Sequence, residues 1–171
     1  MNIPRIITYN NGESAKVVSE CSMKKAVKDL KRNTDNDKKI DISISVDGTW
    51  QKGGYVSLNG IVAAASIDSG KIIDIEVMSK MCKVCENKQE IVSSEEFKTW
   101  YKGHEQSCSA NYEESPMMEV AGAVRIFNRS IEERGVRYTS YYGDGDSKAF
   151  TTVKNMYGLD SVKKLNVLAT I

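Results

Sequence analysis

The sequence predicts an α/β fold in which helices pack against a mixed β-sheet. Residues 40–46 alternate between apolar and polar side chains, as a strand with one buried face does. Residues 116–134 instead repeat apolar side chains at helical spacing. Segments of these two kinds follow one another as three strands, a helix, a strand, a helix and a strand. Because a helix separates the third strand from the fourth, we expect parallel as well as antiparallel pairs in one sheet.

The composition is that of one ordinary packed domain. Of the 171 residues, 40% are hydrophobic and 27% charged, so the chain can bury a core and is not disordered throughout. With 24 basic and 23 acidic side chains the net charge is +1, which excludes a long basic arm but not a local basic patch. No apolar run approaches the roughly 20 residues of a membrane span, and no signal-peptide core is present. We therefore expect an intracellular protein with reduced thiols and no membrane contact.

Residues 14–32 are expected to form an amphipathic helix with a basic outer face. We interpret it as a solvated helix leading into the domain; a DNA-contacting helix is the alternative. Cys21 is expected on the face of this helix. The polar residues 33–39 read as a linker, so residues 1–39 are assigned to an N-terminal helix and linker, and residues 40–171 to the core.

Three strands joined by short turns are expected to form an antiparallel meander. The first covers residues 40–46 and ends at the turn dipeptide 47–48. The second covers residues 56–67, and the third covers residues 71–78 after a tight turn at 68–70.

A longer helix is expected over residues 116–134. Ser115 can cap it, Pro116 suits its first position, where no amide donor is needed, and Gly135 is well placed to end it. The apolar side chains expected on one face of this helix are Val120, Ala123, Val124, Phe127 and Ile131.

Three further elements complete the expected order. A fourth strand covers residues 136–143, a short helix starts at Asp146 and ends near Gly158, and a fifth strand covers residues 162–168. This order is that of an RNase H-like core.

Two carboxylates fall at the ends of different predicted strands. Asp47 follows the first strand and Asp144 follows the fourth. Reactive groups collect at strand ends in open α/β sheets, and carboxylates there can bind Mg²⁺ or Mn²⁺. Asp-Gly is also a routine turn, which is the structural alternative for Asp47. Asp146 precedes a helix and is better explained as its cap, so Asp144 is the preferred ligand of the two.

Four segments in order resemble Mutator-like transposase domains. They are VDGTWQK at 46–52, SLNG at 57–60, DIEVMSK at 74–80 and YGDGDSKAF at 142–150. The resemblance covers roughly residues 20 to 165. It implies an RNase H-like fold, transposon-end DNA as substrate, strand cleavage and joining that depends on Mg²⁺ or Mn²⁺, and a nuclear location.

The resemblance also assigns the acidic residues of the site. Asp47 corresponds to the family's first catalytic acid and Asp144 to its second, with Asp146 as the less favoured candidate. The third acid lies on a helix beyond the fifth strand, and the sequence ends at Ile171, about where that strand should finish; Asp160 precedes the strand and is a poor substitute. We therefore expect a truncated core with an incomplete catalytic set. A non-catalytic DNA- or protein-binding module, domesticated or decayed, is the alternative, and a homo-oligomer remains open.

Three of the four cysteines and the single histidine form a metal-ligand pattern. Cys82 and Cys85 are separated by two residues, and His104 and Cys108 follow as a second close pair, separated by three. Two such pairs suit a tetrahedral structural zinc site with no open position; buried apolar cysteines are the alternative. The pattern lies in an insert at about residues 81–112, between the third strand and the long helix.

A short helix is expected between the two ligand pairs, with Phe97, Trp100 and Tyr101 packing over the metal. Stacking of Trp100 on a DNA base is the alternative, and Trp50 is likewise expected in the core. Six lysines in or near these segments are interpreted as ordinary surface residues, with phosphate contacts as the alternative: Lys52, Lys80, Lys83, Lys88, Lys98 and Lys102.

Overall fold

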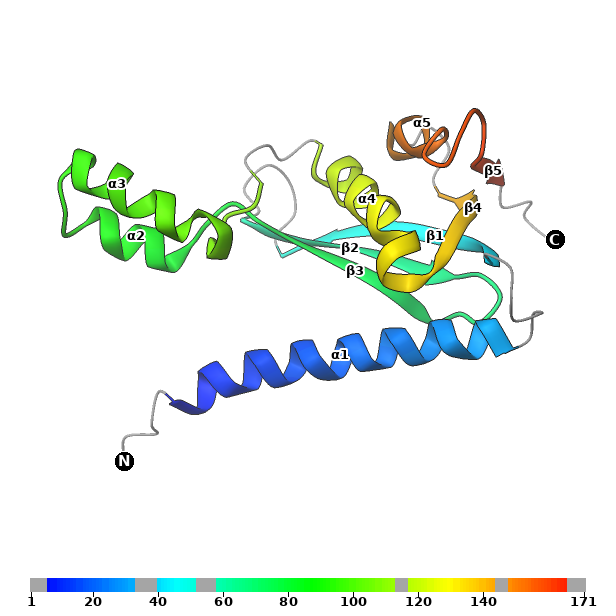
Figure 1. The fold of residues 1–171 in the computed structure, drawn as a ribbon, viewed down its shortest axis with the longest axis horizontal. Helices are drawn as coiled ribbons and strands as arrows, with labels where there is room; N and C mark the ends of the chain where they lie inside the picture. The colour runs from blue at the N-terminus through cyan, green and yellow to red at the C-terminus, as the bar shows by residue number, and fades with distance from the viewer. Residues whose placement is uncertain (1–5, 33–39, 52–57, 113–116, 144–147, 166–171) are drawn as a thin grey trace.

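A single five-stranded mixed sheet organises the protein (Figure 1). The computed structural model describes residues 6–32, 40–51, 58–112, 117–143 and 148–165, with side chains described from residue 14 onward. The strand order is β3-β2-β1-β4-β5. The pairs β1/β2 and β2/β3 are antiparallel, whereas β1/β4 and β4/β5 are parallel. The expected mixed sheet and antiparallel meander are therefore confirmed. The strands are β1 (Ile40–Trp50), β2 (Asn59–Ser66), β3 (Ile72–Ser79), β4 (Val136–Tyr142) and β5 (Lys163–Leu165).

The helices fall into three groups around the sheet (Figure 1). The long α1 packs against β3, α4 and α5 lie over the sheet, and α2 and α3 project beyond one end of it. No helix in the described part of the chain is long and apolar enough to cross a membrane. The helical elements are α1 (Ile6–Arg32), α2 (Lys83–Gln89), α3 (Ser94–His104), the 3-10 turn η1 (Glu105–Ser107), α4 (Met118–Arg129), the π-helical turn η2 (Ser130–Arg134) and α5 (Lys148–Val153).

The N-terminal helix has the predicted end but an earlier start. It ends at Arg32, as expected, and begins at Ile6 rather than at residue 14. Met23, Ala26 and Val27 are buried, which gives the helix one apolar stripe facing the sheet. Cys21 is exposed on the helix surface, in agreement with its predicted place. The predicted linker at 33–39 lies outside the described residues.

The first strand does not end at Asp47-Gly48, so the expected turn there is wrong. β1 continues to Trp50, and Asp47 pairs with Ala63 of β2. The strand continues because its ladder to β2 runs on from Ile44 to Trp50. Gly60 then admits the ring of Trp50: a Cβ at that position would lie 2.0 Å from two ring atoms. Trp50 thus packs on β2 but is only partly buried, outside the hydrophobic core in which it was expected.

The long helix is divided into an α-helical and a π-helical part. The α-helix ends at Arg129, η2 continues to Arg134, and Gly135 ends the helix with φ +64, as predicted. Its start at Met118 has no side-chain cap, and the predicted cap Ser115 and first residue Pro116 lie outside the described residues.

The buried face of α4 differs in part from the predicted face. Val120 and Val124 are only partly buried, and Ile131 is 36% exposed. The buried face of α4 is rotated by about one residue from the predicted face. After Arg129 the wider π turn changes which side chains face the core. The buried side chains and glycine of α4 are Met118, Gly122, Ala123, Ile126 and Phe127.

The C-terminal elements follow the predicted order, and α5 ends at Val153 rather than near Gly158. β4 ends at Tyr142, α5 begins at Lys148, and a series of turns leads from α5 into β5. The predicted start of the short helix at Asp146 and the end of the fifth strand at residue 168 lie outside the described residues.

A buried ion-pair network connects the sheet to three helical elements. Asp74 of β3 is fully buried and accepts hydrogen bonds from the guanidinium groups of Arg129 and Arg134. Arg134 also pairs with Glu20 of α1, and Arg129 pairs with Glu76 of β3. Burial alone would lower the pKa of Arg134, but its hydrogen bonds to Glu20 and Asp74 outweigh burial and raise it, so the group stays charged.

We expect Asp74→Asn to lower the free energy of unfolding by about 3 kcal/mol at neutral pH, because it leaves the buried Arg134 and the partly buried Arg129 guanidinium groups without their shared carboxylate. Asp41→Asn is the control, since the Asp41–Arg137 pair is 46% and 37% exposed and should contribute no more than about 1 kcal/mol. Urea unfolding of both variants measures the difference, and equal losses would contradict the role assigned to Asp74.

Candidate functional site

The segment between β3 and α4 leaves and re-enters the sheet at the same place. The backbone amides of Asn111 and Tyr112 both donate to the carbonyl of Ser79, the last residue of β3. The Asn111 side chain accepts from the Ser79 amide at 2.9 Å and donates to the Val77 carbonyl at 2.8 Å. Closed at its base in this way, the intervening segment forms the α2–α3 projection seen at one end of the sheet in Figure 1.

The predicted ligands converge in this projection. One ligand atom from each of Cys82, Cys85, His104 and Cys108 lies within 4.8 Å of the other three. The sulfur of Cys82 is 3.4 Å from Nε2 of His104, and the sulfurs of Cys85 and Cys108 are 3.6 Å apart. Tetrahedral zinc with ordinary bond lengths requires S···N of roughly 3.6 Å and S···S of roughly 3.8 Å. The four side chains therefore form a Cys₃His cluster that fits a metal ion such as zinc.

Local structure explains how each ligand reaches the cluster. Cys82 is the N-cap residue of α2 and Cys85 lies in its first turn, so the two face the same side, as residues three apart on a helix do. His104 is the last residue of α3, and the 3-10 turn η1 brings Cys108 back beside it. A capping box fixes the start of α3, where Ser93 accepts from the Glu96 amide and the Glu96 carboxylate accepts from the Ser93 amide.

The electrostatics of the thiols favour a bound cation. Burial opposes ionisation of Cys82, but hydrogen bonds from Ser109, from the Cys85 backbone and from His104 outweigh burial and lower its pKa to about 5. Burial, followed by its contacts with the Cys108 and Cys82 sulfurs, raises the pKa of Cys85 to about 12. One thiolate is thus stabilised, and further thiolates beside it are opposed by like charge. A divalent metal ion supplies the positive charge that lets all three ionise.

Neighbouring side chains hold the His104 ring. The hydroxyl of Ser107 lies 3.3 Å from Nδ1, the nitrogen that does not face the cluster; such contacts orient histidine ligands. Trp100 stacks on the imidazole with centroids 4.7 Å apart, and the Lys88 ammonium lies 5.9 Å from the Trp100 ring centroid. The predicted helix between the ligand pairs and the packing of Trp100 over the site are therefore confirmed, whereas α2 was not expected.

The projection has little core of its own. Neither α2 nor α3 contains a buried residue. Segments that cannot bury enough apolar surface need a metal or disulfides to stay folded. The Cys₃His cluster is thus the main interaction holding these two helices together.

The predicted acidic residues lie elsewhere. Asp47 is exposed in the second half of β1, next to the buried Val46. Because adjacent strand residues point to opposite faces, Asp47 points away from the sheet face that α4 covers. Asp160 is exposed in the turn before β5, with φ +46. Asp144 and Asp146 lie outside the described residues.

The strand register relates Asp47 to the end of β4. β1 and β4 are adjacent and parallel, and Ser45 is the partner of Tyr142, the last residue of β4. Asp47 follows Ser45 by two residues, and Asp144 follows Tyr142 by two residues.

Two groups of residues around the sites were not anticipated from the sequence. Asn111 closes the base of the projection, and Asp74 and Glu76 pair with arginines 49 to 60 residues away. Asp74 and Glu76 alternate with apolar side chains in a strand that is otherwise rich in isoleucine and valine, and this pattern could have marked them as unusual. No local sequence pattern around Asn111 predicts its contacts with β3.

Comparison with known proteins assigns the family. The family model described as Mutator-like transposase matches residues 7–167, nearly the whole chain. The comparisons with curated proteins and with solved structures return no match. The matched range includes α1, all five strands and the Cys₃His projection. The chain therefore belongs to the Mutator-like transposase family.

Proposed function

We propose that this chain is a transposase-derived domain with an RNase H-like fold that acts on DNA in the nucleus. Membership of the Mutator-like transposase family supports the transposase origin. The strand order β3-β2-β1-β4-β5, with an antiparallel meander and two parallel strands, supports the RNase H-like assignment. Fold alone does not carry the chemistry, so the acidic residues decide the activity.

The parallel register of β1 and β4 is the observation that carries the proposed metal site. Asp47 and Asp144 each lie two residues beyond one paired position, Ser45 and Tyr142. Carboxylates that leave neighbouring parallel strands at one level can share a hard cation. In our proposal Asp47 and Asp144 hold Mg²⁺ or Mn²⁺, with Asp146 as the less favoured ligand. Such ions activate an attacking oxygen and stabilise a leaving one in phosphoryl transfer.

The role of Asp47 is to position the cation, and its surroundings suit that role. The strand holds its backbone through the ladder to β2, while its side chain is exposed. In the described part of the chain, Asp47 belongs to no group of three or more ligand side chains. We therefore propose that this chain alone has little or no strand-transfer activity.

In the same proposal the Cys₃His cluster holds a structural zinc ion. Three thiolates and one imidazole leave no coordination position for substrate. The ligand spacing fits tetrahedral zinc, and the helices it joins have no buried residues.

The charge of the projection favours a second candidate function, a non-catalytic module that binds a protein partner. Residues 81–112 contain four lysines and five glutamates, and three thiolates on a divalent ion add a further negative charge. Lys83 and Lys98 are paired with Glu86 and Glu95. A surface of this balance does not attract phosphate strongly. Binding of a partner that survives Asp47→Asn would support this candidate.

We expect purified chain to contain about one zinc ion, and Cys85→Ser to lose it, because a closed tetrahedral site needs all four ligands. The α2–α3 helices should then melt while the sheet remains folded. Elemental analysis together with circular dichroism measures both effects. Cys21→Ser is the matched control, since Cys21 is exposed on α1. Equal zinc content in the two variants would contradict the assignment.

We expect Asp47→Ala to weaken Mn²⁺ binding about tenfold or more, because the site loses one of its charged oxygen ligands. Titration calorimetry on the zinc-loaded chain measures the affinity. Asp68→Ala is the control, since Asp68 is equally exposed but lies in the β2–β3 turn. Unchanged Mn²⁺ affinity in Asp47→Ala would contradict the proposed site.

A further inference from the structure

The basic charge of this nearly neutral chain is concentrated on its first helix. α1 contains six basic and three acidic residues, a net charge of +3, whereas the whole chain has a net charge of +1. The remainder therefore carries −2. Three of the basic side chains, Lys24, Lys28 and Lys31, follow one another at helical spacing along one side of the buried stripe formed by Ala26 and Val27.

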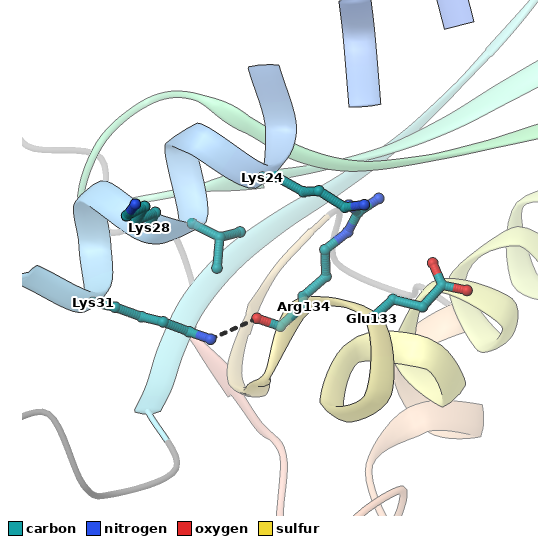
Figure 2. Close-up of a pocket in the computed structure, with 6 residues that line it drawn as sticks. Lys24, Lys28, Lys31, Glu133 and Arg134 are labelled. Atoms are coloured by element: carbon teal, nitrogen blue, oxygen red, sulfur yellow. Dashed lines mark hydrogen bonds between the residues drawn. The ribbon is translucent and has the colours of Figure 1, made fainter. Parts of the chain in front are cut away.

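These three lysines open onto a pocket. A cavity of about 180 Å³ lies between α1 and η2. Figure 2 shows the side chains that line it. Val27 forms its apolar wall, and Glu133 is its one acidic lining residue, 3.8 Å from the Arg129 guanidinium. Its remaining lining residues are Lys24, Lys28, Lys31 and Arg134.

Packing fixes the pocket in place. The Lys31 ammonium donates to the Arg134 carbonyl at 2.8 Å, which joins the two walls (Figure 2). Arg134 is 5% exposed and is held by Glu20 and Asp74. Glu20 also pairs with Lys24 at 3.5 Å, although that lysine is 64% exposed and only weakly neutralised. Arg134 and Lys31 are thus held in place by the fold, whereas Lys24 and Lys28 are exposed side chains.

One polar atom at the pocket has no partner. Nε of Arg134 is buried and has no hydrogen-bond acceptor among the described residues. A buried donor without an acceptor is unfavourable, and such atoms in native structures point to a missing ligand or water. An oxyanion bound beside the guanidinium would supply the acceptor. The adjacent ammonium groups would neutralise its charge.

We propose that the pocket between α1 and η2 binds a phosphate group. A tetrahedral oxyanion matches a site with several cationic donors, a guanidinium and one apolar wall. That the bound phosphate belongs to the DNA backbone is an inference that rests on the function proposed above. The pocket itself depends only on the geometry of α1 and η2.

Two probes test the proposal on the full zinc-loaded chain: inorganic phosphate and a short DNA duplex. The readout is the Nε–H resonance of Arg134 in ¹⁵N-correlated NMR spectra. We expect a saturable shift with phosphate and the same shift with duplex. Duplex binding that leaves this resonance in place while phosphate moves it would keep the pocket and assign it to free phosphate. No saturable shift with phosphate overturns the proposal.

Two double variants of α1 distinguish loss of the pocket from a general loss of positive charge on the helix. Lys24→Gln combined with Lys28→Gln should weaken duplex binding about fivefold at moderate salt and reduce the slope of log affinity against log salt by roughly 1 to 2. Lys16→Gln combined with Lys25→Gln removes the same charge from α1 outside the pocket, and an equal loss there overturns the pocket. A normal phosphate response in Asp47→Ala, with Mn²⁺ binding lost, separates this result from the proposed metal site.

Discussion

The fold depends on one buried carboxylate, Asp74, which holds together elements that are far apart in the sequence. It lies on β3 and receives both Arg129 at the end of α4 and Arg134 at the end of η2. Through Arg134 the same network reaches Glu20 on α1. A charge buried this deeply is stable only when its partners are in place, so the positions of β3, the α4–η2 helix and α1 are linked. The phosphate pocket proposed between α1 and η2 exists because Arg134 is fixed in this way.

The Cys₃His projection is built on a different principle. Its two helices bury no residue, and its four ligands, together with Trp100 stacked on His104, take the place of a hydrophobic core. Asn111 closes the base against β3 by three hydrogen bonds, one through its backbone amide and two through its side chain. The sheet and its packing helices therefore do not require the projection for their own core. In the proposed function, this separation lets a metal-stabilised projection and the acidic site on the sheet act independently.

Local patterns in the sequence were sufficient for most elements. Alternation predicted β1 and helical spacing predicted α3 and α4, while the ligand spacing identified the metal cluster because each ligand pair comes from one turn. The end of β1 was predicted wrongly, since Asp47-Gly48 resembles a turn unless the pairing with β2 is known. Ile131 was misplaced because the π turn after Arg129 depends on tertiary contacts, such as the Ser130 hydroxyl with Tyr157. The ion pairs of Asp74 join residues 55 and 60 positions apart. Local sequence patterns cannot predict contacts over such a separation.

The central claim is that Asp47 holds a divalent cation beside the end of β4. Paramagnetic broadening by Mn²⁺ in amide NMR spectra of the zinc-loaded chain tests it most directly. We expect substoichiometric Mn²⁺ first to broaden the signals of Val46, Asp47 and Gly48 on β1 and of Tyr142 on β4. The β2–β3 turn at Asp68 should be unaffected at the same concentration. Broadening centred on Asp68 or on the glutamates of the projection, with the β1 signals unchanged, would contradict it.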